Sequence, residues 1–108
     1  MSNADDEHSV IITFQYGLEE IDPIYDLVDK LSKILSETNI GNCDGHEIAM
    51  DNSDGSIYLY GSNAEILFKA IKPTLDSTSF LRGANATLRF GSAKNGASEI
   101  EVIIGEKG

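Results

Sequence analysis

The sequence predicts an α+β sandwich of the ferredoxin-like type, in which a sheet forms one layer and two helices form the other. Three observations support this prediction. Apolar residues alternate with polar ones in five short segments, they recur at helical spacing in two longer segments, and the order along the chain is βαββαβ with one extra strand. Right-handed crossovers then give the sheet order 5-4-1-3-2, with both helices on one face.

The first strand and the first helix occupy the N-terminal third of the chain. From Val10 to Tyr16 every second side chain is apolar, which is typical of a strand with one buried face. Asp22 followed by Pro23 is typical of a helix start, with Asp22 as the N-cap. Apolar residues keep helical spacing over the following turns, and we expect residues 39–45 to form a turn-rich connection.

The middle of the chain contains a predicted hairpin. Its first strand should turn Ile48 and Met50 towards the core, and its second strand should do the same with Ile57 and Leu59. Residues 52–55, Asn-Ser-Asp-Gly, suit the intervening turn. Asn and Asp tolerate left-handed geometry there, and Gly accepts a positive φ.

A second helix should follow the hairpin. Asn63 or Ser62 supplies the N-cap, and Glu65 lies in the first turn, where the helix dipole favours an acid. Pro73 interrupts the apolar stripe of this helix. We therefore expect the regular helix to end near Lys72 or to kink there.

Two further strands complete the predicted sheet. Residues 84–90 alternate after Gly83, and residues 91–97 contain Asn-Gly and should form a hairpin loop. In the last strand we expect Ile100, Val102 and Ile104 to face the core. The alternating residues Glu99, Glu101 and Ile103 should face away from it.

Length and composition indicate one folded domain. The 108 residues are 41% hydrophobic. They contain neither an apolar run of roughly 20 residues nor a signal-peptide pattern, so we expect a cytoplasmic protein. We assign residues 9–105 to the domain and residues 1–8 to a disordered acidic tail, whose Met-Ser-Asn-Ala start resembles a cloning remnant. The single cysteine, Cys43, rules out an internal disulfide.

The net charge of −10 is concentrated in the first half of the chain. Residues 1–54 contain thirteen acids against two lysines, a formal charge of −11, whereas residues 55–108 contain five acids and six bases, a formal charge of +1. Phosphate binding needs a basic face, so this composition argues against a nucleic-acid partner. It favours a cation or a basic protein surface as the partner.

The predicted topology gathers polar residues on two surfaces. The first is an acidic rim, where the end of the first strand, the start of the first helix and the hairpin turn should meet. The acidic rim consists of Glu19, Glu20, Asp22, Asp26, Asp51 and Asp54. The second is the open sheet face, which no helix covers and whose contact residues would be Gln15, Tyr58, Tyr60 and Arg89. Solvation of acids and cross-strand pairing of tyrosines would explain the same residues without a partner.

No motif in the sequence indicates a cofactor or a metal site. Cys43 and His46 are close in sequence, but a zinc site needs about four ligands. The same pair could form a Cys–His nucleophile, although residues at this spacing entering a strand seldom make the required hydrogen bond. The turn at Gly55 lacks the bidentate acid that ends a calcium loop. Residues 61–63 precede a helix and could hold an anion, yet they lack the spacing of a phosphate loop.

The chain contains four distinctive runs, which are Asp-Gly-His-Glu at 44–47, D-x-S-D-G-S-x-Y-x-Y-G at 51–61, A-x-x-L-F-x-x-I-x-P-x-L at 64–75 and L-R-F-G at 88–91. These runs resemble an uncharacterised group of small, acidic bacterial single-domain proteins. The resemblance covers residues 43–91 and implies no catalytic role. In size and charge alone, the chain is also similar to immunity proteins that neutralise secreted bacterial toxins.

These observations favour a non-catalytic protein-binding module, in the specific form of an immunity-type inhibitor of a basic bacterial toxin. One alternative is a small regulatory domain that forms a homodimer through its sheet and binds a metabolite or a metal. Another alternative is an enzyme that uses Cys43 and His46. We expect no cofactor, no nucleic-acid partner and no membrane partner.

Overall fold

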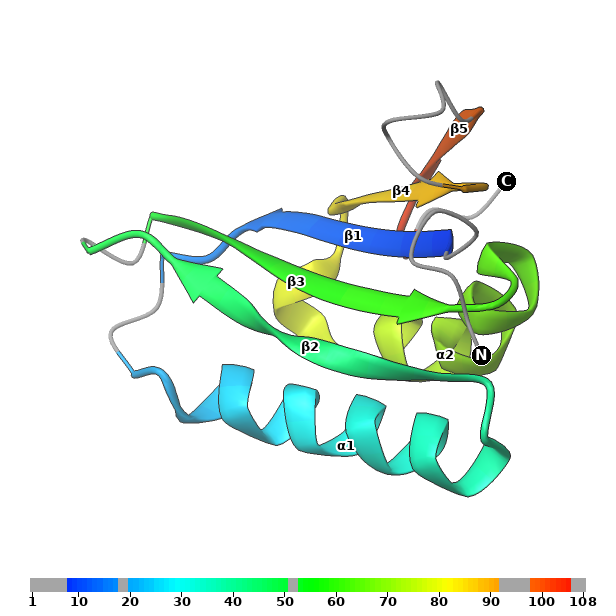
Figure 1. The fold of residues 1–108 in the computed structure, drawn as a ribbon. Helices are drawn as coiled ribbons and strands as arrows, with labels where there is room; N and C mark the ends of the chain where they lie inside the picture. Colours follow the sequence, from blue (N-terminus) through cyan, green and yellow to red (C-terminus); the bar gives the residue numbers. More distant parts are fainter. Residues whose placement is uncertain (1–7, 18–19, 51–52, 92–97, 106–108) are drawn as a thin grey trace.

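The structure is a two-layer sandwich in which a five-stranded antiparallel sheet packs against two α-helices (Figure 1). This computed structural model describes residues 8–17, 20–50, 53–91 and 98–105. The elements in chain order are β1 (His8–Gln15), α1 (Asp22–Thr38), β2 (Gly41–Ile48), β3 (Asp54–Gly61), α2 (Ala64–Asp76), the 3-10 helix η2 (Ser79–Leu81), β4 (Asn85–Arg89) and β5 (Glu99–Ile103).

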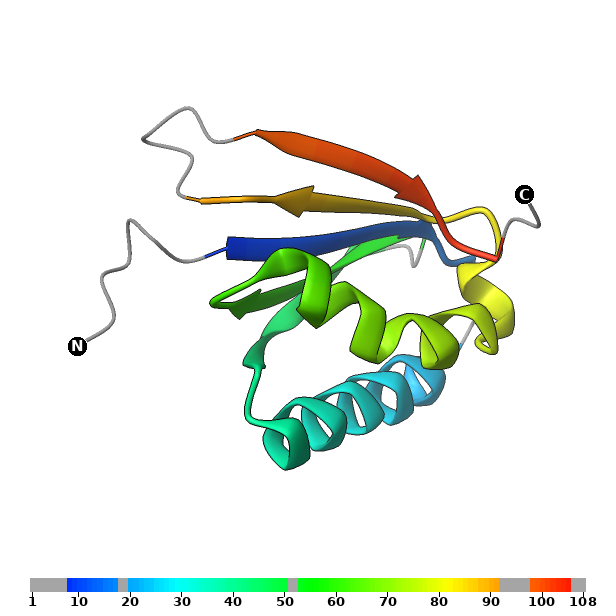
Figure 2. The same ribbon diagram turned by 90° about the vertical axis from the view of Figure 1, so that its right-hand side faces the viewer.

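The strand order is β2-β3-β1-β4-β5, which is the predicted order counted from the other edge. β1 lies in the centre of the sheet and pairs with β3 on one side and with β4 on the other. Both helices lie on the same face of the sheet, and the opposite face is left open (Figure 2). The predicted ferredoxin-like α+β sandwich with an extra C-terminal strand is therefore confirmed.

The core lies between the helices and the covered face of the sheet. The apolar residues that alternate along β1 and β3 are buried, among them Ile12 and Leu59. Each α-helix buries one apolar stripe, which includes Leu31 in α1 and Ile71 in α2. Full burial of one such side chain stabilises the fold by about 1.5–3 kcal/mol. Among the described residues, no buried side-chain nitrogen or oxygen lacks a hydrogen-bond partner.

The strand β2 differs from its prediction at both ends. It begins at Gly41, so most of the expected connection 39–45 is strand, and Met50 lies beyond its end, fully exposed. A β-bulge between Cys43 and Gly45, which has a φ of 130°, interrupts the alternation in the N-terminal half of the strand, whereas Met50 is exposed because β2 already ends at Ile48. A bulge adds one residue to the strand and shifts the alternation, so a strict period of two fails across it.

The helix ends also correct two predictions. The N-cap of α1 is Ile21, with no capping side-chain bond, and Asp22 lies in the first turn instead. α2 does not end near Lys72 but continues through Pro73 to Asp76. A proline near the end of a helix removes one hydrogen bond, and burial of the stripe on either side of it holds the last turn in place. The predicted N-cap of α2 is confirmed, because the Asn63 side chain accepts a hydrogen bond from the Ile66 amide at 3.0 Å.

The strand β5 buries less than predicted. Ile104 is buried just after the strand, but Ile100 is 53% exposed and Val102 is only half-buried. Figure 2 shows β5 at the edge of the sheet farthest from both helices, so no helix covers the face that carries Ile100. The predicted hairpin loop before it falls on 91–97, and residues 92–97 lie outside the described residues.

The start of β1 also differs from the prediction, because His8 belongs to the strand rather than to the tail. Its Nδ1 accepts a hydrogen bond from the Ala64 amide at 3.0 Å. Its ring packs edge-on against Phe90, with the ring centroids 5.7 Å apart. Across the described part of the chain, no helix has the length and apolar character needed to span a membrane.

Candidate functional site

One end of the sheet carries the described residues of the acidic rim. Gln15 at the end of β1 pairs with Asp54 at the start of β3, and α1 begins at the same end, at the left of Figure 1. Four rim acids are described and all are exposed, namely Glu20, Asp22, Asp26 and Asp54. Glu19 and Asp51 lie outside the described residues. The use of this end by a partner stays a prediction.

Tyr16 explains how the segment after β1 is held at this end. Its backbone amide donates to the Ser53 carbonyl at 2.9 Å, and its hydroxyl donates to the Glu20 carbonyl. The ring packs edge-on against Phe80 at a centroid distance of 5.3 Å. Burial raises the pKa of the Tyr16 phenol above its usual value, and the negative charges of Glu20 and Asp22 raise that pKa further. Two of the rim acids therefore lie close to this aromatic anchor.

Basic side chains lie at the same end, which the sequence analysis did not predict. Asp26 and Lys30 line one shallow groove beside η2, and Asp54 and Arg82 line another. Within the described residues, no three His, Cys, Asp or Glu side chains lie close enough together to hold a metal ion. The acidic rim is therefore a surface of mixed charge rather than a compact cluster of carboxylates.

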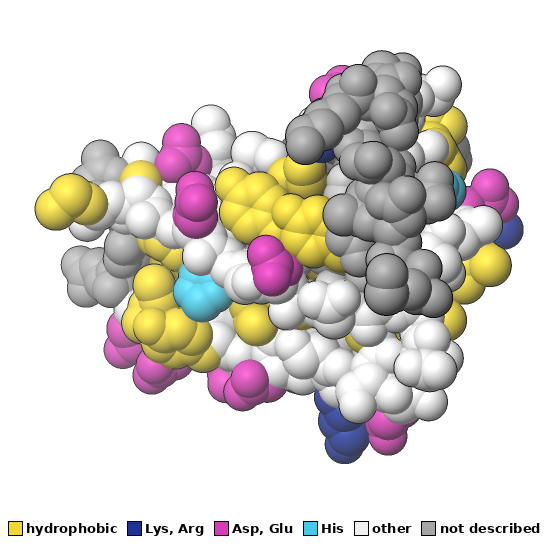
Figure 3. Space-filling view, in the orientation of Figure 1, with side chains coloured by type: hydrophobic (Ala, Val, Ile, Leu, Met, Phe, Trp, Pro, Cys, Tyr) yellow, Lys and Arg dark blue, Asp and Glu magenta, His cyan; other side chains and the backbone are white. Residues whose placement is uncertain are grey.

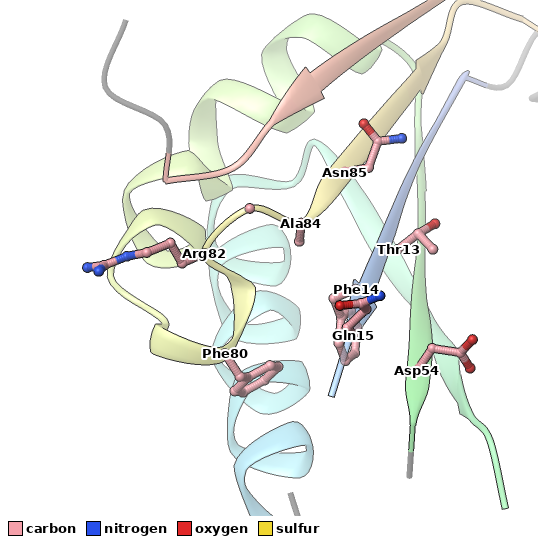
Figure 4. A pocket seen from close by; sticks show the side chains of 9 residues that line it. Thr13, Phe14, Gln15, Asp54, Phe80, Arg82, Ala84 and Asn85 are labelled. Atoms are coloured by element: carbon pink, nitrogen blue, oxygen red, sulfur yellow. The ribbon is translucent and has the colours of Figure 1, made fainter. Parts of the chain in front are cut away.

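The larger of the two grooves, of about 610 Å³, forms where β1 and β4 separate. Their pairing ends at Thr13 and Asn85, after which β1 stays with β3 and the chain before β4 turns back to η2. Figure 4 shows Asp54 and Arg82 on opposite sides of the groove, with the Arg82 side chain extending away from the other labelled residues. Phe80 was missed because its only local signal is an aromatic residue in a polar connection.

The open sheet face carries the second predicted set of residues. Tyr58 and Tyr60 flank the buried Leu59, so they lie on the uncovered side, where both are half-buried. Figure 3 shows an apolar patch over β1 and β3 on this face, with acidic side chains at its margin. Gln15 and Arg89 lie on the same side of their strands and are exposed and half-buried respectively.

Neighbouring acids partly engage these open-face residues. The Arg89 Nε donates to the Glu99 carboxylate at 2.6 Å, within a cross-strand pair of β4 and β5. The Tyr58 hydroxyl lies 3.5 Å from the Glu47 carboxylate, across the pair of β3 and β2. Arg89 is thereby largely neutralised, and the open face presents aromatic rings surrounded by net negative charge.

Cys43 and His46 both lie on the covered side of β2, opposite Leu59 and Ile57 in β3. The His46 ring packs edge-on against Tyr25 of α1, with centroids 5.5 Å apart. Among the described contacts of Cys43 and His46, no hydrogen bond joins the two side chains. A nucleophilic cysteine needs such a bond to its base, and the described contacts do not supply it. The enzyme hypothesis stays a prediction, and the activity of a Cys43→Ser variant would test it.

The start of α2, which the sequence offered as an anion site, already has intramolecular partners. His8 accepts a hydrogen bond from the Ala64 amide, and Asn63 accepts one from the Ile66 amide. These bonds occupy two of the amides that would otherwise face an anion.

A search of known protein families, of curated proteins and of solved structures found no match for this chain. The function must therefore be inferred from the surfaces themselves.

Proposed function

We propose that this chain is a non-catalytic protein-binding module that binds a basic protein through its open sheet face and the adjoining part of the acidic rim. The observation that supports this most directly is the uncovered face of the sheet, where Tyr58 and Tyr60 are half-buried, and where acidic side chains lie at the margin of an apolar patch (Figure 3). An immunity-type inhibitor of a basic bacterial toxin is the specific form of this proposal, and the acidic composition is its support.

The tyrosines suit protein recognition for a physical reason. Tyrosine offers a large contact area, loses little conformational entropy on binding and adds a hydroxyl that forms hydrogen bonds. Tyr58 pairs with Ile11 in β1, so an apolar strip runs across the middle of the face. A partner that covers this strip would bury both rings.

The charge around the strip selects the partner. Glu47, Asp54 and Glu101 are exposed at the margins of the open face, whereas Arg89 is paired with Glu99. A net charge of −10 increases the rate of encounter with a positively charged protein and disfavours an acidic one. Asp54 pairs with Gln15 in the sheet, so of the four described rim acids it is the one that belongs to the open face.

The experiment is capture of a partner from an extract of cells that produce this protein, followed by affinity measurement with the purified partner. We expect Asp54→Lys and Tyr58→Ala each to weaken binding by about tenfold or more, and added salt to weaken binding of the unaltered chain. Glu37→Lys is the matched control, because Glu37 is also exposed but lies in the last turn of α1. Equal loss in the two lysine variants, or salt-independent binding, would contradict the proposal.

The groove between β1 and β4 favours a second candidate, a small regulatory domain with a metabolite in that groove. Its volume of about 610 Å³ is that of a small-molecule site, and Phe80 provides an apolar wall. We would measure the shift in melting temperature with a panel of metabolites and metals, for the unaltered chain and for Phe80→Ala. A ligand that stabilises only the unaltered chain would favour this candidate.

A further inference from the structure

We propose that the outer edge of β5 binds an extended basic segment of the partner as a sixth strand of the sheet. This inference rests on the proposed function and names the kind of segment that the partner contributes. Strand addition to an exposed sheet edge supplies main-chain hydrogen bonds for affinity, and alternate side chains provide specificity.

The outer side of β5 carries backbone groups that do not point towards β4. The Ile104 amide donates to the Ala84 carbonyl at 2.8 Å, and the Ile104 carbonyl accepts from the Gly83 amide at 2.9 Å, so Ile104 directs its backbone groups towards β4. Backbone direction alternates along an antiparallel strand, so Glu99, Glu101 and Ile103 direct theirs outwards. In the described part of the chain the sheet ends at β5, with no strand on this side.

The side chains of β5 are also incompletely covered. Ile100 is 53% exposed on the helix side, and Ile103 is 45% exposed on the open sheet face. Neither α-helix extends under this edge (Figure 2). An added strand would place an apolar residue beside Ile100, and it would remove apolar surface from water on both faces.

The charge on this edge selects a basic segment. Glu99 and Glu101 lie on the open-face side of β5 and are exposed. Glu99 already pairs with Arg89 at 2.6 Å, whereas the partner of Glu101 among the described residues is the Asn85 amide, at 3.4 Å. A lysine or arginine opposite Glu101 would form a favourable cross-strand pair. The segment that fits therefore alternates basic residues, facing the open side, with apolar residues facing the helix side.

A second copy of this chain fits the same edge poorly. If two β5 strands paired antiparallel about their centres, Glu101 would lie opposite Glu101 of the other copy, or opposite Glu99 after a shift of two residues. Like charges directly opposite each other destabilise a strand pair. Charged side chains on an edge strand are also the usual protection against unwanted strand pairing. A basic segment would neutralise the charges of Glu99 and Glu101 and could therefore still pair with β5.

The test uses the whole chain and a short peptide of alternating lysine and valine that matches β5 in length. Amide hydrogen exchange and NMR chemical shifts report the contact site. We expect peptide binding to slow exchange of the Glu99, Glu101 and Ile103 amides and to shift the β5 resonances. Two control peptides keep the charge: one has the lysines grouped at one end, and the other carries N-methyl groups on the amides that would face β5.

Both control peptides should bind about tenfold more weakly than the alternating peptide, because they lose the side-chain alternation or the backbone bonds. Glu101→Lys should weaken binding of the alternating peptide by a similar factor, while Glu37→Lys should leave it within about twofold. Equal binding of the N-methylated peptide, or shifts confined to the open face, would overturn the proposal. Asp54→Lys separates the proposed function from the strand-addition proposal. This substitution should weaken binding of the partner protein but should leave binding of the alternating peptide unchanged.

Discussion

The two edges of the sheet, β2 and β5, are protected in different ways. α1 packs beside β2, where Tyr25 contacts the His46 ring at 5.5 Å, and the bulge at Gly45 interrupts its pairing pattern. Neither α1 nor α2 lies under β5, and among the described residues of this edge the carboxylates of Glu99 and Glu101 provide the protection. Two helices are enough to cover four strands of this sheet, so the fifth strand stays partly exposed.

The difference shows which edge can be used by another molecule. Removing a packed helix from β2 would expose core residues such as Leu31, at a large cost in free energy. The carboxylates at β5 repel another strand only when that strand places acidic residues opposite them. An edge protected by charge therefore stays accessible to a partner of opposite charge, whereas an edge protected by packing does not.

The largest expected effect tests the packing under β2. Leu31→Ala should lower the free energy of unfolding by about 3 kcal/mol, because Leu31 is fully buried between α1 and the sheet. Ile100→Ala in β5 should cost less than about 1 kcal/mol, because half of that side chain is already in water. Urea denaturation measures both values. Comparable losses in the two variants would show that β5 is packed as tightly as β2.

The next effect concerns the close approach of the chain before β2 to the end of β3. A Cβ atom on Gly61 would lie 2.4 Å from the backbone carbonyl oxygen of Ile40. Gly61→Ala should therefore cost about 2 kcal/mol, since backbone atoms cannot move aside as a flexible side chain can. Ser62→Ala, at the exposed next position, is the control and should stay within about 0.5 kcal/mol in the same denaturation experiment.

A smaller effect concerns the tie between α2 and the chain just after β5. The Asp76 carboxylate accepts from the Lys72 ammonium at 2.6 Å and from the Gly105 amide at 3.1 Å. The hydrogen bond from Lys72 is the main cause that lowers the pKa of Asp76 below its usual value. Partial burial opposes this shift, and the hydrogen bond from the Gly105 amide adds to it. Because Asp76 is ionised more readily when folded, its stabilisation is complete above the unfolded pKa and is lost as the pH falls through the folded pKa.

Asp76→Asn should accordingly cost about 0.5 kcal/mol at neutral pH, a modest value because the Asp76 and Lys72 side chains are partly exposed. The gap between the variant and the unaltered chain should close as the pH falls through the lowered folded-state pKa of Asp76. Denaturation midpoints measured across acidic pH provide the check. A gap that persists at the lowest pH would mean that the carboxylate charge is not what holds this contact.

The smallest change in stability is expected for Glu101→Gln, which leaves the fold intact but removes the repulsion between copies at β5. We expect concentration-dependent self-association of this variant in sedimentation experiments. Glu47→Gln makes the same change on β2, and we expect this variant to self-associate no more than the unaltered chain does. Identical behaviour of the two variants would contradict the proposed difference between the edges.

Much of the candidate site could be predicted from local patterns. The alternation that buries Ile57 and Leu59 also places Tyr58 and Tyr60 on the other side of β3, whatever lies around the strand. The topology then brought Asp54 to the end of β1. Arg82 and Phe80 were missed, because the connection between α2 and β4 has no periodicity that would predict which residues approach the sheet.

By itself the sequence determined the elements, their order and the buried faces of β1, β3 and β4, because these follow from side-chain periodicity, caps and turn residues. Only the tertiary structure decided the start of β2 at Gly41 with its bulge between Cys43 and Gly45, the exposure of Ile100 and the passage of α2 through Pro73. The physical reason is that an apolar residue in a strand is buried only where another layer reaches it. No local sequence pattern predicts how many of the five strands the two helices cover.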